Sequence, residues 1–338
     1  MTLPVPEVVG SARSRRLRLP RSWVPVVATL VLLVIMYSVG VARYPAFSDP
    51  QVILNVFIDN GFLLVVAVGM TFVILTGGID LSVGSVVALT TIVTASLLRD
   101  GWPAGVVAVL VLLMGSTLGL AMGCMIHFFE IQPFVVTLAG MFLARGLCYT
   151  ISTSAITIDN GFWTTMANSR IAVAGYHVSP SVLIALAVLI VGGVVLASTP
   201  FGRSVYAIGG SAQSALLMGL ALGRTRIAVY TISGFCSALG GILITFYEAS
   251  GDPLRGIGLE LDAIAAVVIG GTLLTGGSGY LIGTVFGVLV LGLIQTVINF
   301  EGTLSSWWTK IVIGILLLAF ILLQRVVGLR GAPVLPRR

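Results

Sequence analysis

The sequence contains few charged residues. Of 338 residues, 18 are basic and 12 are acidic, so that 9% of the chain is charged, whereas charged residues make up about 25% of an ordinary soluble domain. Hydrophobic residues account for 57% of the chain, and the mean hydropathy is +1.11. So little charge cannot cover the surface of a water-soluble protein of this length. The composition therefore excludes a large soluble catalytic domain and predicts a polytopic membrane protein.

Lysine, cysteine and histidine are scarce as well. Lys310 is the only lysine, so the chain has no phosphate-binding loop of the Gly-x-x-x-x-Gly-Lys-Ser/Thr type and is not expected to hydrolyse ATP. The three cysteines lie in apolar segments without a Cys-x-x-Cys motif, which predicts buried thiols and no disulfide framework. Neither a His-Glu-x-x-His helix nor a Gly-x-Ser-x-Gly turn occurs. We therefore predict no catalytic, cofactor-binding or metal-binding residue and no enzyme activity.

Long apolar runs dominate the rest of the sequence. A helix needs about 20 apolar residues to cross the hydrocarbon core of a membrane. Runs of about this kind lie near residues 23–41, 52–76, 80–98, 104–128, 132–152, 179–198, 227–247, 260–275, 279–300 and 307–326. The sequence therefore predicts an all-α polytopic membrane protein with about ten transmembrane helices.

The basic residues predict an orientation for these helices. If the N-terminus lies in the cytoplasm and successive runs alternate sides, most basic residues fall in cytoplasmic segments, in agreement with the positive-inside rule. The chain then divides into a basic cytoplasmic tail over 1–22, a transmembrane domain over 23–326 and a cytoplasmic tail over 327–338. The basic residues collect at the ends of apolar runs and form no long stripe, which favours contact with membrane lipid and argues against nucleic acid.

Two glycine-rich breaks interrupt the apolar pattern at related positions. The stretch AVGMTFVILTGGIDLSVGSVVAL (67–89) aligns with AVVIGGTLLTGGSGYLIGTVFGV (266–288), and each copy predicts a helix, a Leu-Thr-Gly-Gly break and a second helix. Transporters built from repeats place broken helices in this way. Asp80 could cap the helix that follows the first break. The break residues are gate or pathway candidates, with capping and close packing as the alternative: Gly77, Gly78, Asp80 and Ser82.

Polar side chains also occur inside predicted helices. Asp59 and Asn60 lie at about the same predicted depth as Arg145, and because ions inside a membrane usually pair, we hypothesise an ion pair between Asp59 and Arg145. Gln295 and Asn299 are four residues apart and therefore share one helix face. Their amides suit sugar hydroxyls, but hydrogen bonding between helices explains them equally well. These five residues complete the set of pathway candidates.

Two loops are longer than a connection between helices requires, an external one over 153–178 and a cytoplasmic one over 199–226. From Ser211 to Leu222 the second loop has the pattern of a short amphipathic helix, and the preceding glycine pair would let the chain turn into it. We interpret it as a docking helix for a cytoplasmic partner, with a solvated connector as the alternative. The candidate docking residues are Gly209, Gly210, Ser211, Ala215, Met218 and Gly219.

Four segments of the chain resemble the permease subunits of ribose- and galactose-type ABC sugar importers. They are AVGMTFVILTGGIDLSVGSVVALT (67–90), VTLAGMFLARGL (136–147), VYAIGGSAQSALLMGL (205–220) and ELDAIAAVVIGGTLLTGGSGYLIGT (260–284). The resemblance extends over nearly the whole chain. Two further segments, IDNGFLLVVAVGMTFVIL (58–75) and GLIQTVINFEGTLSSWWTKIVIGILL (292–317), are most similar to permeases assigned to galactofuranose import.

The resemblance implies a type II-like importer fold in the bacterial inner membrane, with both termini in the cytoplasm. It also implies three partners: a second permease, identical or paralogous; a cytoplasmic ABC ATPase that uses the ATP; and a periplasmic or lipoprotein sugar-binding protein. By position, 205–220 is similar to the family's coupling helix, although Ser211 stands where many relatives have Asn, and 76–85 is similar to its signature break. Ribose, xylose or another aldose is the alternative substrate. An ion-coupled secondary transporter, with Asp59 or Asp80 carrying a proton, is the alternative mechanism.

Overall fold

The computed structural model describes residues 23–173, 175–303, 305 and 307–329. The predicted tail 1–22 and residues 330–338 lie outside the described residues. All ten predicted apolar runs are helical: α1 (Val24–Arg43), α2 (Pro50–Leu75), α3 (Val83–Arg99), α4 (Ala104–Phe128), α5 (Pro133–Ile151), α7 (Pro180–Ser198), α10 (Leu222–Glu248), α11 (Leu259–Ile269), α12 (Leu281–Glu301) and α13 (Trp307–Leu329). The all-α polytopic fold is therefore confirmed.

Two of the ten helices are shorter than the others. Over the described residues, eight helices are long and apolar enough to cross a membrane. Of the other two, α3 with 17 residues lies at the lower limit for a membrane-spanning helix, and α11 with 11 residues is too short to cross a bilayer by itself. Each lies next to one of the glycine-rich breaks, since α2 and α3 flank the first break and α11 and α12 flank the second. The predicted helix–break–helix pattern is therefore present in both copies.

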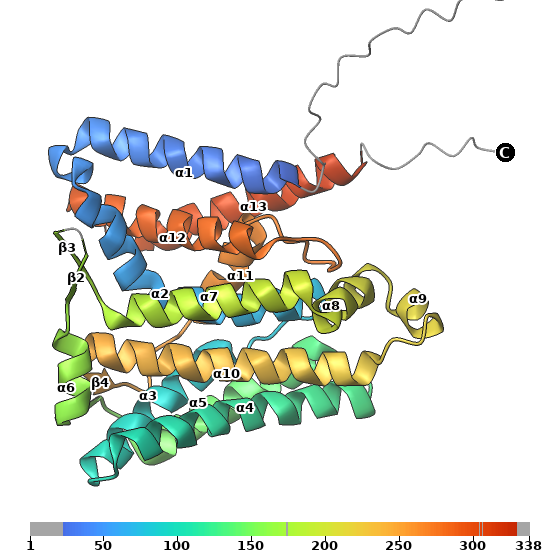
Figure 1. The fold of residues 1–338 in the computed structure, drawn as a ribbon, viewed down its shortest axis with the longest axis horizontal. Helices are drawn as coiled ribbons and strands as arrows, with labels where there is room; N and C mark the ends of the chain where they lie inside the picture. Colours follow the sequence, from blue (N-terminus) through green and yellow to red (C-terminus); the bar gives the residue numbers. More distant parts are fainter. Residues whose placement is uncertain (1–22, 174, 304, 306, 330–338) are drawn as a thin grey trace, which may run out of the picture.

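The long helices run roughly parallel and define two ends of the molecule (Figure 1). One end carries the short helices α8 (Pro200–Gly210) and α9 (Ala212–Leu217), and α1 begins and α13 ends there; we call it the α9 end. The opposite end, the α6 end, carries the helix α6 (Gly161–Asn168) and a hairpin of β2 (Ile171–Val173) and β3 (Tyr176–Val178). The predicted long loops are thus largely structured.

The core of the molecule lies around α2. Of its most hydropathic stretch, 83% is buried, against 22% for α1 and 11% for α13. The helix α10 packs against α2, α3 and α4. Glycines allow the backbones of α4 and α10 to touch, because a Cβ added at Gly234 would overlap the Gly115 carbonyl oxygen. Small residues at helix crossings are the usual means of close packing in membranes.

The α6 end is fixed by polar contacts and a small sheet. Strand β1 (Ile156–Thr157) pairs antiparallel with β4 (Ser250–Gly251), which directly follows α10. From α6, the buried Trp163 indole donates a hydrogen bond to the Thr245 hydroxyl on α10, at 2.9 Å. The β1–β4 pairing and the Trp163 hydrogen bond hold the end of α10, which forms one wall of the cavity described next.

The three cysteines are free thiols, two of them buried.

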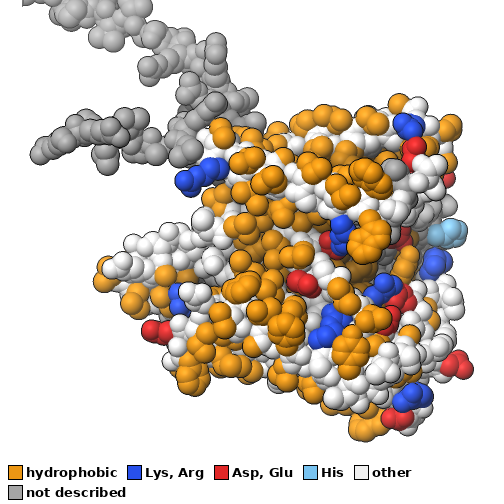
Figure 2. Space-filling model, turned by 180° about the vertical axis from the view of Figure 1, so that it is seen from behind, with side chains coloured by type: hydrophobic (Ala, Val, Ile, Leu, Met, Phe, Trp, Pro, Cys, Tyr) orange, Lys and Arg blue, Asp and Glu red, His pale blue; other side chains and the backbone are white. Residues whose placement is uncertain are grey.

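Charged side chains gather in one region of the face turned away from the viewer of Figure 1. Figure 2 shows that face, where these Lys, Arg, Asp and Glu side chains surround a hollow. Charged groups inside a membrane normally face a protein interior or a water-filled cavity. The hollow is therefore the first place to look for a function.

Candidate functional site: a polar cavity and a glycine junction

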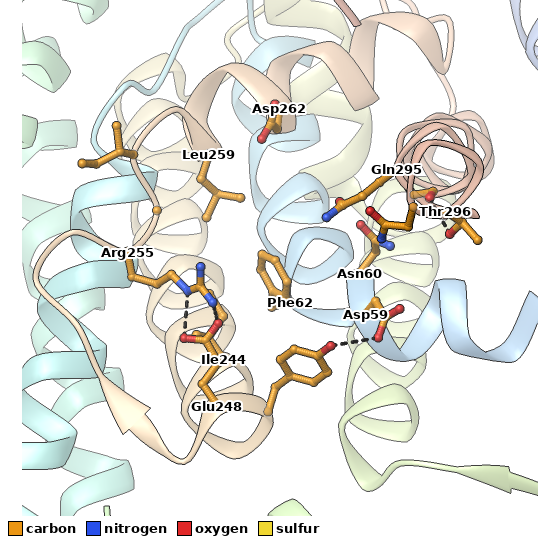
Figure 3. A pocket seen from close by; sticks show the side chains of 15 residues that line it. Asp59, Asn60, Phe62, Ile244, Glu248, Arg255, Leu259, Asp262, Gln295 and Thr296 are labelled. Carbon is orange, nitrogen blue, oxygen red and sulfur yellow. Dashed lines mark hydrogen bonds and ion pairs between the residues drawn. The ribbon is translucent and has the colours of Figure 1, made fainter. Parts of the chain in front are cut away.

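A polar cavity of about 320 Å³ lies near the α6 end. It is enclosed by α2, α10, the loop 252–258, α11 and α12 (Figure 3), and its lining residues are Asp59, Asn60, Phe62, Ile244, Tyr247, Glu248, Arg255, Gly256, Ile257, Leu259, Asp262, Gly292, Gln295, Thr296 and Asn299. A second hollow of about 330 Å³ extends toward α13. The two share the side chains of Asn60, Phe62, Leu259, Asp262, Gln295 and Asn299. Volumes of this size are typical of sites for small molecules.

Two polar contacts mark the mouth of the cavity (Figure 3). The Tyr247 hydroxyl at the end of α10 donates a hydrogen bond to Asp59 Oδ1 on α2, at 3.2 Å. Arg255 forms an ion pair with Glu248, and its Nε lies 2.8 Å from Glu248 Oε2. Burial lowers the pKa of the Arg255 guanidinium.

Three amide side chains converge on the cavity from α2 and α12. Asn60 is 9% exposed and donates from Nδ2 to the Val56 carbonyl, at 2.9 Å. Gly292 makes room for it, since a Cβ added there would press against Asn60 Nδ2. Among the described residues, the amides of Gln295 and Asn299 have no hydrogen-bond partner. The cavity therefore presents donors and acceptors that are free for a polar solute or water.

The hypothesised ion pair between Asp59 and Arg145 is wrong. Arg145 Nη1 instead donates to the carbonyl oxygen of Pro253 and to that of Arg255, the latter at 2.9 Å. The depth of a residue along its own helix does not reveal which helices are neighbours, and α5 packs on α3 and α4. Arg145 thus fastens the loop that carries Arg255, a role that the sequence did not suggest.

Several residues of the cavity were missed by the sequence analysis. Asp262 in the first turn of α11 accepts from Lys310 Nζ with both carboxylate oxygens, each at 2.7 Å. Tyr247, Glu248 and Arg255 belong to the end of α10 and the loop after it. All lie at ends of apolar runs, where charged and aromatic residues are ordinary membrane-interface features, so no local signal distinguished them.

A second constellation, which we call the glycine junction, lies toward the α9 end, where the two glycine-rich breaks meet. The Gly277 N–H donates a hydrogen bond to the Leu75 carbonyl, at 2.9 Å. Gly77 and Gly276 both have positive φ, +80° and +83°, a conformation that glycine adopts without strain. A Cβ added at Gly209 would overlap the Leu75 carbonyl oxygen. The two breaks and α8 therefore touch through backbone atoms.

This geometry corrects the prediction that the Gly209–Gly210 pair makes a turn. Both glycines lie in the last turn of α8, and the chain changes direction at Ser211, whose φ is −163°. Gly209 is required for close approach to the first break, while a Cβ added at Gly210 would meet nothing within 4 Å. The two adjacent glycines thus have different roles.

Asp80 and Ser82 are buried beside the junction and face protein groups. Asp80 Oδ1 accepts from the Ser82 N–H and hydroxyl, at 2.9 and 2.6 Å, and Oδ2 accepts from the Ser233 hydroxyl, at 2.7 Å. Asp80 is not the N-cap, because α3 begins at Val83 and Ser82 occupies that position. Gly78 leaves space for the Tyr230 hydroxyl. These contacts favour the close-packing interpretation of the break, without the predicted helix cap.

The predicted docking helix is present but shorter than expected. The helix α9 spans Ala212–Leu217, with Ser211 as N-cap accepting from the Ser214 N–H at 3.2 Å. Ala215 is buried, and Gly219 with a φ of +77° ends the segment. Three apolar side chains at the end of α9 and just after it are exposed: Leu216 by 60%, Leu217 by 83% and Met218 by 68%.

Comparisons with known proteins agree that this chain is similar to permease components of transport systems. The family described as the branched-chain amino acid transport system permease component matches residues 52–321. The chain is 48% identical to the inner membrane ABC transporter permease protein YjfF of Escherichia coli (strain K12), over 89% of this chain and 92% of that protein. It is 41% identical to the fructose import permease protein FruG of Bifidobacterium longum (strain NCC 2705), over 94% of this chain and 95% of that protein. It is 38% identical to the ribose import permease protein RbsC of Bacillus subtilis (strain 168), over 88% of this chain and 90% of that protein. No solved structure matches.

Proposed function

Because the chain belongs to the family of ABC transporter permease components that includes sugar import permeases, we propose that it carries a monosaccharide across the bacterial inner membrane. It is a multi-pass transport subunit without catalytic chemistry of its own. Galactofuranose is the sugar we favour, because segments 58–75 and 292–317 are most similar to permeases assigned to that sugar. Ribose, xylose or another aldose is the alternative substrate.

The observation that carries the proposal is the polar cavity. Sugars offer many hydroxyl groups, and the cavity supplies amides that can both donate and accept, together with the carboxylate of Asp59. Its volume of about 320 Å³ admits a solute the size of a monosaccharide. A cavity of this polarity among membrane-spanning helices has no evident use in a membrane anchor.

A second permease is proposed to cover the hollow face of Figure 2. Ile257, which lines the cavity beside Arg255, is exposed by 66%. Leu261, the neighbour of the lining residue Asp262, is exposed by 61%. Facing lipid, the charged groups of Arg255 and Glu248 would be costly. Facing a second permease, identical or paralogous, they would line a shared, water-filled pathway.

An ABC ATPase is proposed to bind at the α9 end. The chain has no lysine-bearing phosphate loop, so the ATP would be bound and hydrolysed by this partner. The exposed side chains of Leu216, Leu217 and Met218 supply an apolar anchor for a groove on the ATPase. The α9 end and both termini would then be cytoplasmic. A sugar-binding protein, periplasmic or lipoprotein, would dock on the α6 end.

Uptake into proteoliposomes tests this proposal. The vesicles would contain the permease with its candidate ATPase and binding protein, and labelled galactofuranose, ribose and galactose would be offered with and without internal ATP. ATP-dependent uptake of one sugar is expected. Uptake that needs a proton gradient but no ATP would support the ion-coupled secondary transporter and overturn the importer mechanism.

A further inference from the structure

We propose that the cavity itself selects its solute by charge, binding uncharged sugars and rejecting anionic ones such as sugar acids and sugar phosphates. The inference rests on the proposed function, because it assigns substrate specificity to the same cavity. The group proposed to determine the specificity is Asp59. The amides of Asn60, Gln295 and Asn299 are proposed to hold the sugar hydroxyls.

The first step concerns hydrogen bonds that the protein leaves unmade. Asn60 is 9% exposed, and among the described residues only its Nδ2 has a hydrogen-bond partner. Gln295 and Asn299 have no hydrogen-bond partner among the described residues, and they stand about 6 Å apart along α12, one helical turn. Polar groups that are shielded from water without a hydrogen-bond partner are costly. A solute with several hydroxyl groups would satisfy them, because each amide can donate and accept.

The second step is the balance of charge in the cavity walls. Both hollows together are lined by three carboxylates and two cations. Arg255 is paired with Glu248, and Lys310 is held by both oxygens of Asp262. Among the described residues, Asp59 is the one lining carboxylate without a cationic partner, since its contact is the neutral Tyr247 hydroxyl.

The consequence is a site with a surplus negative charge and, among the described residues that line it, no free cation. An anionic solute would meet repulsion from Asp59, and each cation that could receive it is already engaged by a carboxylate. Like charges at short range repel more strongly at a partly enclosed site than in bulk water. An uncharged sugar meets no such penalty. A cationic amino sugar is expected to be tolerated.

Equilibrium binding to the full-length permease in lipid nanodiscs tests this step without the binding protein. The probes are labelled D-galactose, D-galacturonate and D-galactosamine. We expect saturable binding of galactose and galactosamine, and binding of galacturonate that is weaker by about tenfold. Equal binding of galactose and galacturonate, or no saturable binding of any of the three, would overturn the proposal.

Charge substitutions make the test specific. Asp59→Asn is expected to reduce the galacturonate deficit to about threefold or less. Asp262→Asn, which frees Lys310, should also strengthen galacturonate binding, whereas Lys310→Gln, which frees Asp262, should weaken it further. Asp100→Asn, an exposed carboxylate outside the cavity, is the matched control and should leave the three affinities unchanged.

The outcomes separate this inference from the proposed function. Discrimination by the isolated permease together with failure of ATP-dependent uptake by the full complex would retain the charge selection and overturn the importer mechanism. ATP-dependent uptake by a permease that binds galactose and galacturonate equally would support the importer mechanism and overturn the charge selection. If Asp59→Asn, Asp262→Asn and Lys310→Gln all bind like the unchanged protein, the charge balance described above does not select the solute.

Discussion

The cavity near the α6 end and the glycine junction toward the α9 end handle polar groups inside the membrane in opposite ways. In the cavity, the side chains of Gln295 and Asn299 have no hydrogen-bond partner among the described residues. At the junction, backbone groups satisfy one another directly, as in the bond from Gly277 N–H to the Leu75 carbonyl. The cavity is open and lined by polar side chains, whereas at the junction a Cβ added at Gly209 would overlap the Leu75 carbonyl oxygen.

The difference indicates where the molecule tolerates change. At the junction, a Cβ added at Gly209, Gly276 or Gly277 would overlap backbone atoms, and close-packed interiors resist the displacement of those atoms. In the cavity, removal of a side chain leaves the surrounding helices in contact elsewhere. Substitutions at the junction should therefore affect folding and transport together, while substitutions in the cavity should affect transport alone.

The largest effect is expected from Gly209→Val. The new side chain would overlap the Leu75 carbonyl oxygen and the Gly277 nitrogen, and overpacking of this kind costs about 3 kcal/mol. Thermal unfolding of the purified permease should shift to a clearly lower midpoint, and uptake should be lost. Gly210→Ala is the matched control, since its Cβ meets nothing within 4 Å. Normal stability and uptake of Gly209→Val would show that the junction is not rigid.

A smaller effect on stability is expected from Asp80→Ala. The substitution leaves the hydroxyls of Ser82 and Ser233 and the Ser82 N–H buried without their acceptor, at a cost of about 2 kcal/mol. Asp80→Asn, which keeps one acceptor oxygen, should lose less. The measurement is again the unfolding midpoint, with uptake recorded in parallel. Loss of uptake at unchanged stability would instead give Asp80 a direct role in the pathway.

Local patterns allowed the helices and breaks to be predicted. Apolar runs reveal helices because each must satisfy its own backbone in lipid, and the repeated Leu-Thr-Gly-Gly marks both breaks. The pattern did not show that the breaks touch one another, because Leu75 and Gly277 are distant in the sequence. Gly209 was assigned to a turn because a glycine pair in a loop usually makes one, whereas here a helix approaches other backbone.

The cavity was predicted only in part, for the same reason. Asp59, Asn60, Gln295 and Asn299 stood out because they interrupt apolar runs, and the structure brings all four together. The error was Arg145, whose assigned partner depended on which helices are neighbours. Pairings across helices follow from tertiary packing, which composition and periodicity do not encode.

A double substitution in the cavity, Gln295→Ala with Asn299→Ala, should leave the unfolding midpoint unchanged. It removes two amides that have no hydrogen-bond partner among the described residues. Two hydrogen bonds to a sugar would be lost, so uptake at low sugar concentration should fall by about tenfold. Gln132→Ala, an exposed amide before α5, is the control. A lower unfolding midpoint would show that these amides stabilise helix packing. It would contradict the expectation that substitutions in the cavity, unlike those at the junction, affect transport alone.

The smallest effect on uptake is expected from Tyr247→Phe. The lost hydrogen bond to Asp59 is 3.2 Å long and lies at the exposed mouth of the cavity, where water can replace the hydroxyl. Uptake should therefore change by about twofold at most, with unfolding unaffected, and Tyr149→Phe on the exposed surface of α5 serves as the control. If uptake falls as far as it does in the double amide variant, Tyr247 positions Asp59 for the sugar. The cavity would then depend on a fixed geometry, as the junction does.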